Sequence, residues 1–255
     1  MAFPEYPGGP FLLPLIQTLM KKLLLLSLML TLVSCTALFL LLQRLGGWRY
    51  AMHRFQHNET GLYTHRKQLF ERLPERPGAI LFVGDSQTEQ CEWSELIAIE
   101  GWPVLNRGIT GDHTAGVFNR LPELLRHRPS KMFLMVGVND LLFDTPLPEI
   151  AAHYRALVQQ IRSRSPYTQL VLLGLPSVNN QIKQTGLSPS AVADLNTELA
   201  QIAKEYALPF VDLKTPLSDA EGRLSAKFTE DGLHLNAAAY LVWKQSIAAY
   251  LGAVK

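Results

Sequence analysis

The sequence predicts an α/β domain in which helices cover both faces of a parallel sheet, preceded by an N-terminal transmembrane helix. From about residue 78 onward, short apolar runs alternate with segments whose apolar residues recur at helical spacing. This alternation is typical of a parallel sheet that is buried on both sides. The transmembrane helix is predicted by an uncharged apolar run over residues 23–42, long enough to cross a bilayer of about 30 Å at about 1.5 Å per residue.

Five apolar runs bounded by turn residues are predicted as strands, and the helix-period segments as helices. The strands are expected at 79–83, 103–106, 132–136, 170–173 and 209–213. The helices are expected at 115–126, 147–164, 191–206 and 237–251, with a short one at 62–73. The chain is thereby divided into a tail (1–22), a membrane anchor (23–42), a basic connector (43–77) and a folded domain (78–255).

The apolar run has alternatives to a membrane anchor. A buried core helix would keep a polar stripe, which this run lacks. Lys21 and Lys22 before the leucines also resemble the start of a cleaved secretory signal, and residues 32–35 (LVSC) resemble a lipoprotein cleavage site at Cys35. Because the apolar run continues through 36–42, we favour an uncleaved signal anchor. Basic residues flank both ends of the run, so the distribution of positive charge does not indicate an orientation. A signal anchor usually has a short cytoplasmic tail, and we therefore expect an extracytoplasmic domain, which would be periplasmic in a bacterium.

Charge and cysteine content narrow the possible partners. The first 77 residues contain nine Lys or Arg and four Asp or Glu, a net charge of +5, whereas the whole chain has +2. The remaining part therefore has −3 and no basic surplus for nucleic-acid phosphates, while the basic connector suits anionic lipid headgroups. The two cysteines predict no disulfide framework, and no Cys or His spacing predicts a metal site. The oligomeric state is left open.

Polar loops follow the first three predicted strands. They are residues 84–86 (GDS), 107–111 (RGITG) and 137–140 (GVND). Ligands gather at the carboxyl ends of parallel strands, because loops and helix N-termini meet there. We therefore expect the three loops to form one crevice at one edge of the sheet.

Ser86 is either a helix cap or a nucleophile. A serine after a strand commonly caps the next helix, and nucleophilic attack would need a base. Asp231 and His234 offer one, since an aspartate three residues before a histidine can accept the Nδ1 proton and aim Nε2 outward. Taken alone, this pair would instead indicate a polar turn in which Asp231 makes turn hydrogen bonds and His234 is exposed. Gly111 could supply a backbone N–H, and Asn139 a side-chain amide, to an oxyanion. Equally, Gly111 could serve a turn that needs positive φ, and Asn139 could cap the next helix.

Four segments, taken together and in this order, resemble the sequence blocks of the SGNH, or GDSL, hydrolase family. They are 84–86 (GDS), 106–112 (NRGITGD), 137–140 (GVND) and 231–234 (DGLH). The resemblance runs from about residue 78 to the C-terminus and is nearest to the branch of platelet-activating-factor acetylhydrolase-like and lysophospholipase-like esterases. It implies a flavodoxin-like three-layer α/β/α domain that hydrolyses carboxylic esters with no metal or organic cofactor.

The resemblance also implies a role for each site residue. Ser86 corresponds to the nucleophile, His234 to the general base and Asp231 to its orienting partner. The oxyanion hole corresponds to the N–H groups of Ser86 and Gly111 and the side-chain amide of Asn139. Because a histidine acts as a base only when neutral, activity is expected to fall as the pH drops through the imidazole pKa, about 6.5 when unperturbed.

The substrate is expected to be a small-molecule ester, either a lipid or an acylated envelope carbohydrate, with membrane lipid contacting the N-terminal helix. The main alternative is an O-acyl or O-acetyl transferase, or an O-acetylesterase, acting on cell-envelope polysaccharide. A catalytically inactive binding module is a further alternative, but it would be expected to lack Ser86 or His234. The acyl chain length and the identity of the acceptor, water or an alcohol, are left open by the sequence.

Overall fold

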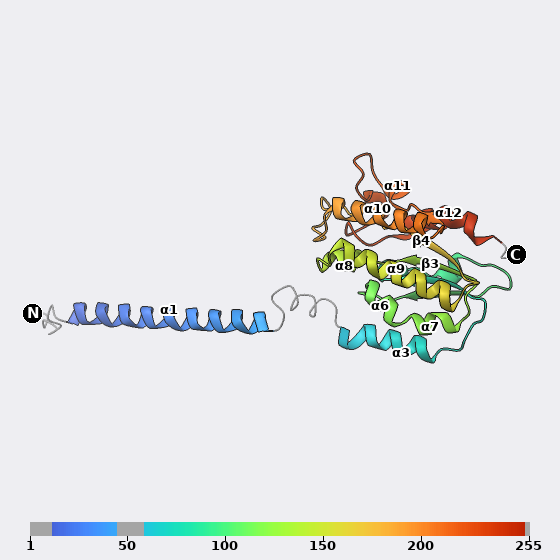
Figure 1. Ribbon diagram of the computed structural model, residues 1–255. Coiled ribbons are helices and arrows are strands. Elements are labelled where there is room, and N and C mark those ends of the chain that lie inside the picture. The colour runs from blue at the N-terminus through green and yellow to red at the C-terminus, as the bar shows by residue number, and fades with distance from the viewer. Residues whose placement is uncertain (1–11, 45–58, 253–255) are drawn as a thin grey trace, which may run out of the picture. The chain divides into compact units, whose positions relative to one another are not determined.

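The computed structural model describes residues 12–44 and 59–252, which belong to two units, 1–56 and 57–255 (Figure 1). In the first unit, helix α1 spans Leu12–Arg44, and the described side chains within it, 16–40, are exposed. Its stretch Ile16–Leu40 is long and apolar enough to span a membrane or to be a signal sequence. The helix begins upstream of the predicted run, so that Lys21 and Lys22 lie inside it, and Cys35 is an exposed free thiol.

The second unit is built on a five-stranded parallel sheet, as the sequence predicts. Its strands are β1 (Ile80–Gly84), β2 (Val104–Gly108), β3 (Lys131–Met135), β4 (Gln169–Leu173) and β5 (Phe210–Val211). Their order is β2-β1-β3-β4-β5, with every neighbouring pair parallel. All residues of β1 and β3 are buried, which explains the apolar runs 80–83 and 132–135 within them. This strand order is that of flavodoxin-like folds, whose ligand crevice lies between β1 and β3.

Helices flank the sheet in two layers. Helices α6 (Thr114–Asn119), α7 (Leu121–Arg126), α9 (Leu147–Arg164) and α10 (Pro189–Glu205) lie side by side (Figure 1), with α9 in contact with the other three. The second layer contains α5 (Trp93–Leu96) and α12 (Ala237–Leu251). There, the ring of Phe82 from β1 stacks on Trp93 at 3.9 Å, and Trp93 meets Trp243 edge-on at 4.9 Å between centroids.

The expected helix at 115–126 is wrong in one respect, because the structure divides it into α6 and α7. Arg120, between them, has φ −100° and ψ 9°. Pro122 lies in the first turn of α7, where its missing N–H costs little, but it cannot donate to the carbonyl four residues earlier. The helices expected at 147–164 and 237–251 are confirmed as α9 and α12. The described residues also contain four short helices and a 3-10 turn outside the expected helices: α4 (Ser86–Glu89), α5, α8 (Val138–Leu142), α11 (Lys214–Leu217) and η2 (Ala226–Phe228).

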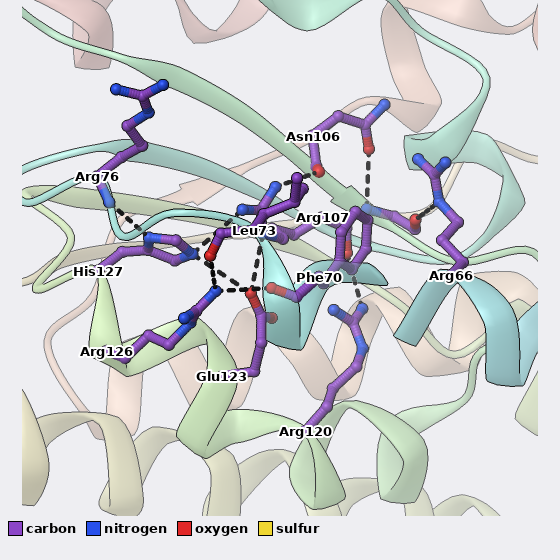
Figure 2. Close-up of polar contacts among 11 residues, drawn as sticks. Arg66, Phe70, Leu73, Arg76, Asn106, Arg107, Arg120, Glu123, Arg126 and His127 are labelled. Atoms are coloured by element: carbon purple, nitrogen blue, oxygen red, sulfur yellow. Dashed lines mark hydrogen bonds and ion pairs between the residues drawn. The ribbon is translucent and has the colours of Figure 1, made fainter. Parts of the chain in front are cut away.

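The short helix expected at 62–73 forms as a π-helical turn, η1 (Glu59–Tyr63), followed by α3 (Thr64–Arg72). This segment packs on the sheet unit, as Figure 2 shows. Phe70 is buried beneath the guanidinium of Arg107, 4.6 Å from the ring centroid. Arg126 of α7 donates to the carbonyls of Phe70 (2.7 Å) and Leu73 (2.6 Å). Helix α3 is therefore part of the same compact unit as the strands.

Candidate active site

The turn from β1 into α4 places Ser86 at the start of a helix without using it as the cap. Asp85 supplies the cap, since its carboxylate accepts the Gln87 N–H at 3.0 Å. A Cβ on Gly84 would lie 2.1 Å from the carbonyl oxygen of Met135, so only glycine allows the strand to turn so close to β3. Ser86 itself is only 6% exposed, and its hydroxyl contacts His234.

The loop before α12 brings Asp231 and His234 to this turn. Ser86 Oγ lies 3.1 Å from His234 Nε2, although the two residues are 148 positions apart. His234 Nδ1 lies 2.7 Å from Asp231 Oδ2, an arrangement that assigns the ring proton to Nδ1 and the lone pair to Nε2. Gly232 between them has φ +80°, and a Cβ there would lie 2.3 Å from the carbonyl oxygen of Asn179. The three side chains therefore form one continuous chain of contacts.

Asp231 is held in its ionised form. Burial acts to raise its pKa, but hydrogen bonds from the His234 ring and from the N–H groups of His234 (2.7 Å) and Leu233 (2.9 Å) outweigh burial and lower the pKa to about 2. The carboxylate is consequently charged at every pH at which an esterase normally works. The charged carboxylate accepts the Nδ1 proton and so holds the tautomer whose Nε2 faces Ser86.

Gly111 lies on the loop after β2, and Asn139 lies in the first turn of α8, which follows β3. Gly111 has φ +82°, which favours glycine, and Asn139 is buried with 5% of its surface exposed. The Asn139 amide donates to the carbonyl of Asp112 at 2.7 Å, and the N–H of Ile109 donates to the carbonyl of Gly84 at 3.0 Å. The loops after β1, β2 and β3 are therefore hydrogen-bonded to one another, as the sheet-edge argument predicts.

A second set of hydrogen bonds, centred on Thr114, also connects the segments that follow β2 and β3. Asp140 accepts from the N–H (3.0 Å) and the hydroxyl (2.5 Å) of Thr114, and that hydroxyl also contacts Nδ1 of His153 at 2.9 Å. Of these three residues, only Asp140 lies in a polar loop that is predicted at the edge of the sheet. Thr114 and His153 carry no local signal, because they lie 26 and 39 positions from their partners.

The GDSL-like Lipase/Acylhydrolase family model matches residues 82–242, more than half of the chain. The chain belongs to this family. It is 27% identical over 203 residues to the alpha2 subunit of platelet-activating factor acetylhydrolase IB from Rattus norvegicus, covering 75% of this chain and 83% of the relative. It is 28% identical over 206 residues to the human alpha1 subunit, with 76% and 78% covered.

Solved structures share the fold of this GDSL hydrolase. One from Streptococcus pneumonia, described as a candidate platelet activating factor, has a TM-score of 0.68 and 29% identity, covering 76% of this chain and 92% of its own. An acetylxylan esterase from Geobacillus stearothermophilus has a TM-score of 0.58 and 18% identity, covering 71% and 96%. The comparisons confirm the family and the α/β fold class that the resemblance implied, and the protein is a serine ester hydrolase of the GDSL type.

Cys91, five residues after Ser86, carries a further group that could in principle act as a nucleophile. Its side chain is buried, and burial together with the charge of Glu92 raises its pKa to about 12. The group is therefore a neutral thiol rather than a nucleophilic thiolate. Within residues 12–44 and 59–252, no cluster of three or more His, Cys, Asp or Glu is arranged to hold a metal ion.

Asp85 gives the hydrolase a measurable dependence of stability on pH. Burial raises its pKa to about 7; the Gln87 N–H opposes this shift, and the negative charges of Asp112 and Asp140 add to it. Because the folded pKa lies above the unfolded value of about 3.9, the folded protein keeps the proton after the unfolded chain has lost it. The stability contributed by Asp85 is therefore complete below pH 4 and is lost as the pH rises to about 7.

Asp85→Asn is expected to remove this dependence while keeping an acceptor for the Gln87 N–H. The free energy of unfolding of the wild type should fall between pH 5 and pH 7.5 by at most about 3 kcal/mol more than that of Asp85→Asn. Denaturant titrations of the full chain in detergent at both pH values measure the difference. Asp194→Asn, at an exposed position on α10, is the matched control and should retain the wild-type pH dependence. Equal pH dependence in Asp85→Asn and the wild type would refute the assignment.

Proposed function

We propose that this hydrolase cleaves carboxylic esters through an acyl-enzyme on Ser86. The observation that carries the proposal is the contact chain from Ser86 Oγ to His234 Nε2 (3.1 Å) and from His234 Nδ1 to Asp231 Oδ2 (2.7 Å). His234 takes the Ser86 proton as Oγ attacks the carbonyl carbon, and the imidazolium then protonates the departing alcohol. Water, deprotonated by the same ring, attacks the acyl-enzyme and releases the acid and free Ser86.

The oxyanion formed in each step is proposed to be held by the N–H groups of Ser86 and Gly111 and by the Asn139 amide. The amide nitrogen carries two hydrogens, of which the contact with the Asp112 carbonyl uses one. The second is then available to the substrate oxygen. Donors fixed in this way stabilise the transition state more than the substrate, because the charge is fully developed only there.

The proposed substrates are esters with short acyl groups, on either a lipid or an envelope carbohydrate. The support comes from the relatives, which include platelet-activating factor acetylhydrolase subunits and an acetylxylan esterase. We expect the full chain in detergent to hydrolyse nitrophenyl acetate and butyrate at least tenfold faster, by kcat/KM, than the decanoate. The Ser86→Ala variant gives the blank rate for each ester. A preference for decanoate would contradict the short-acyl assignment, and no turnover of any ester above the blank would contradict the mechanism.

The N-terminal helix is proposed to be an uncleaved signal anchor that keeps the enzyme next to lipid or envelope esters. The support is the apolar stretch Ile16–Leu40, whose side chains are exposed in the described helix. Intact mass of the membrane-extracted protein separates the alternatives. The full-length mass supports an anchor. The mass of a lipidated chain that begins at Cys35 would indicate a lipoprotein, and the mass of a shorter soluble chain would indicate a cleaved signal; either result would contradict the anchor.

A further inference from the structure

The segment before the first strand reaches the loop that carries Gly111. The Tyr63 hydroxyl, at the end of η1, donates to Asp112 Oδ1 at 3.2 Å. Arg66 Nε, one turn into α3, donates to the carbonyl of Gly108 at 2.8 Å. These two contacts fall on either side of Gly111, three residues before it and one residue after it. Both span more than 40 positions of sequence, so only the tertiary fold creates them.

Arg66 also acts on the loop through Glu89, the last residue of the helix that begins with Ser86. Arg66 Nε lies 3.1 Å from Glu89 Oε1, and Glu89 Oε2 accepts the N–H of Thr110, the residue before Gly111. A single guanidinium therefore fixes one carbonyl of the loop directly and one N–H of the loop through a carboxylate. The same contacts tie the loop to the helix of the nucleophile.

Asp112 is the point at which the supports of the oxyanion hole meet. Its side chain is fully buried, and its Oδ2 accepts from Arg120 Nε at 2.7 Å. Its main-chain carbonyl accepts from the Asn139 amide at 2.7 Å. Burial of a carboxylate is costly unless its oxygens are hydrogen-bonded, so the Tyr63 hydroxyl helps to keep this side chain in place. Any shift of Asp112 would move both Gly111 and Asn139.

Helix α6 packs closely against the contact between Asp112 and Tyr63. A Cβ at Gly116 would lie 2.1 Å from Asp112 Oδ1 and 3.1 Å from the Tyr63 hydroxyl, so helix α6 closes tightly over the contact. The far end of α3 is secured as well, because Phe70 lies beneath Arg107 and Arg107 Nε is paired with Glu123 at 3.1 Å (Figure 2). The segment is thus held at both ends.

We propose that Tyr63 and Arg66 are positioning residues for the oxyanion hole. They hold the loop 108–112 so that the Gly111 N–H and the Asn139 amide face the same point. The proposal rests on the acyl-enzyme mechanism proposed above. Because the oxyanion carries its charge only in the transition state, loss of these contacts should lower kcat and leave KM nearly unchanged.

The test uses the full chain in detergent, with Tyr63→Phe, Arg66→Gln and the double variant. Each single change is expected to lower kcat roughly 5- to 30-fold, and the double change to approach the 10²- to 10³-fold typical of losing one oxyanion donor. KM should stay within about twofold, and Arg66→Lys should recover part of the rate because it keeps a cation beside Glu89. The control is Arg72→Gln, the same charge change at an exposed position of α3, which should behave as wild type.

End-point labelling with a fluorophosphonate counts the sites that contain a reactive Ser86, so kcat is expressed per active site. A lower site count with unchanged kcat per site would show a purely structural role and overturn the proposal. A raised KM with unchanged kcat, or wild-type kinetics in all three variants, would overturn it too. Ser86→Ala measured beside them separates the two hypotheses: turnover persisting in that variant refutes the mechanism itself, whereas an inactive Ser86→Ala with normal Tyr63 and Arg66 variants refutes only the positioning role.

Discussion

Ser86→Ala is expected to lower kcat for nitrophenyl acetate by a factor on the order of 10⁵ to 10⁶, the scale seen when a serine nucleophile is removed from a hydrolase triad. The physical reason is that Ser86 supplies the hydroxyl that contacts His234 Nε2, at 3.1 Å. Cys91, five residues further on, is buried and its pKa is raised to about 12, so its thiol stays protonated. The variant should fold normally, because Asp85 rather than Ser86 caps helix α4.

The matched control for this experiment is Ser94→Ala, an exposed serine on α5, which should retain the wild-type rate. A double variant, Ser86→Ala with His234→Ala, should be no slower than Ser86→Ala alone, since the base is useless without the nucleophile. A Ser86→Ala rate within tenfold of wild type, after subtraction of the spontaneous hydrolysis, would exclude an acyl-enzyme on Ser86. A further fall in the double variant would show that His234 acts in another way.

Asp231→Asn is expected to lower kcat by about 10⁴-fold while preserving the fold. Asparagine can still accept the N–H groups of Leu233 and His234, which shape the turn. However, its amide replaces the charged oxygen that accepts the His234 ring proton, so the ring is driven toward the tautomer with its proton on Nε2. That tautomer cannot accept the proton of Ser86. Asp194→Asn, at an exposed position, serves as the control with unchanged kcat.

The low pKa of Asp231 also predicts how the activity of the wild type and of Asp231→Asn depends on pH. Because its folded pKa of about 2 lies below the unfolded value of about 3.9, the stability from this carboxylate is present above about pH 4 and is lost as the pH falls through 2. Ionisation of Asp231 therefore contributes nothing to a change in wild-type activity between pH 5 and pH 8. If kcat of Asp231→Asn recovered to the wild-type value anywhere in that range, the proposed role of the carboxylate would be wrong.

Some features were missed by local reasoning because their causes lie elsewhere in the chain. The break between α6 and α7 follows from Pro122, a local signal. The buried side chain of Arg120 at the break is explained by its distant partners, the carboxylate of Asp112 and the carbonyls of Gly84 and Arg107. From the sequence, Ser86 could be either a helix cap or a nucleophile. In the structure, the neighbouring Asp85 caps α4. The contacts of Thr114 in α6 with Asp140 in α8 and His153 in α9 form only when these helices pack together.

The sequence by itself determined the α/β class, the positions of the five strands and the identity of the residues brought to one edge of the sheet. It could do so because apolar periodicity and turn residues act over a few positions, and because parallel strands place their following loops together. The tertiary structure decided the distances among Ser86, His234 and Asp231, the buried state of Asp85, and the contacts of Tyr63 and Arg66 with the loop of Gly111. These depend on burial and on hydrogen bonds between distant segments, and such interactions exist only once the chain has packed.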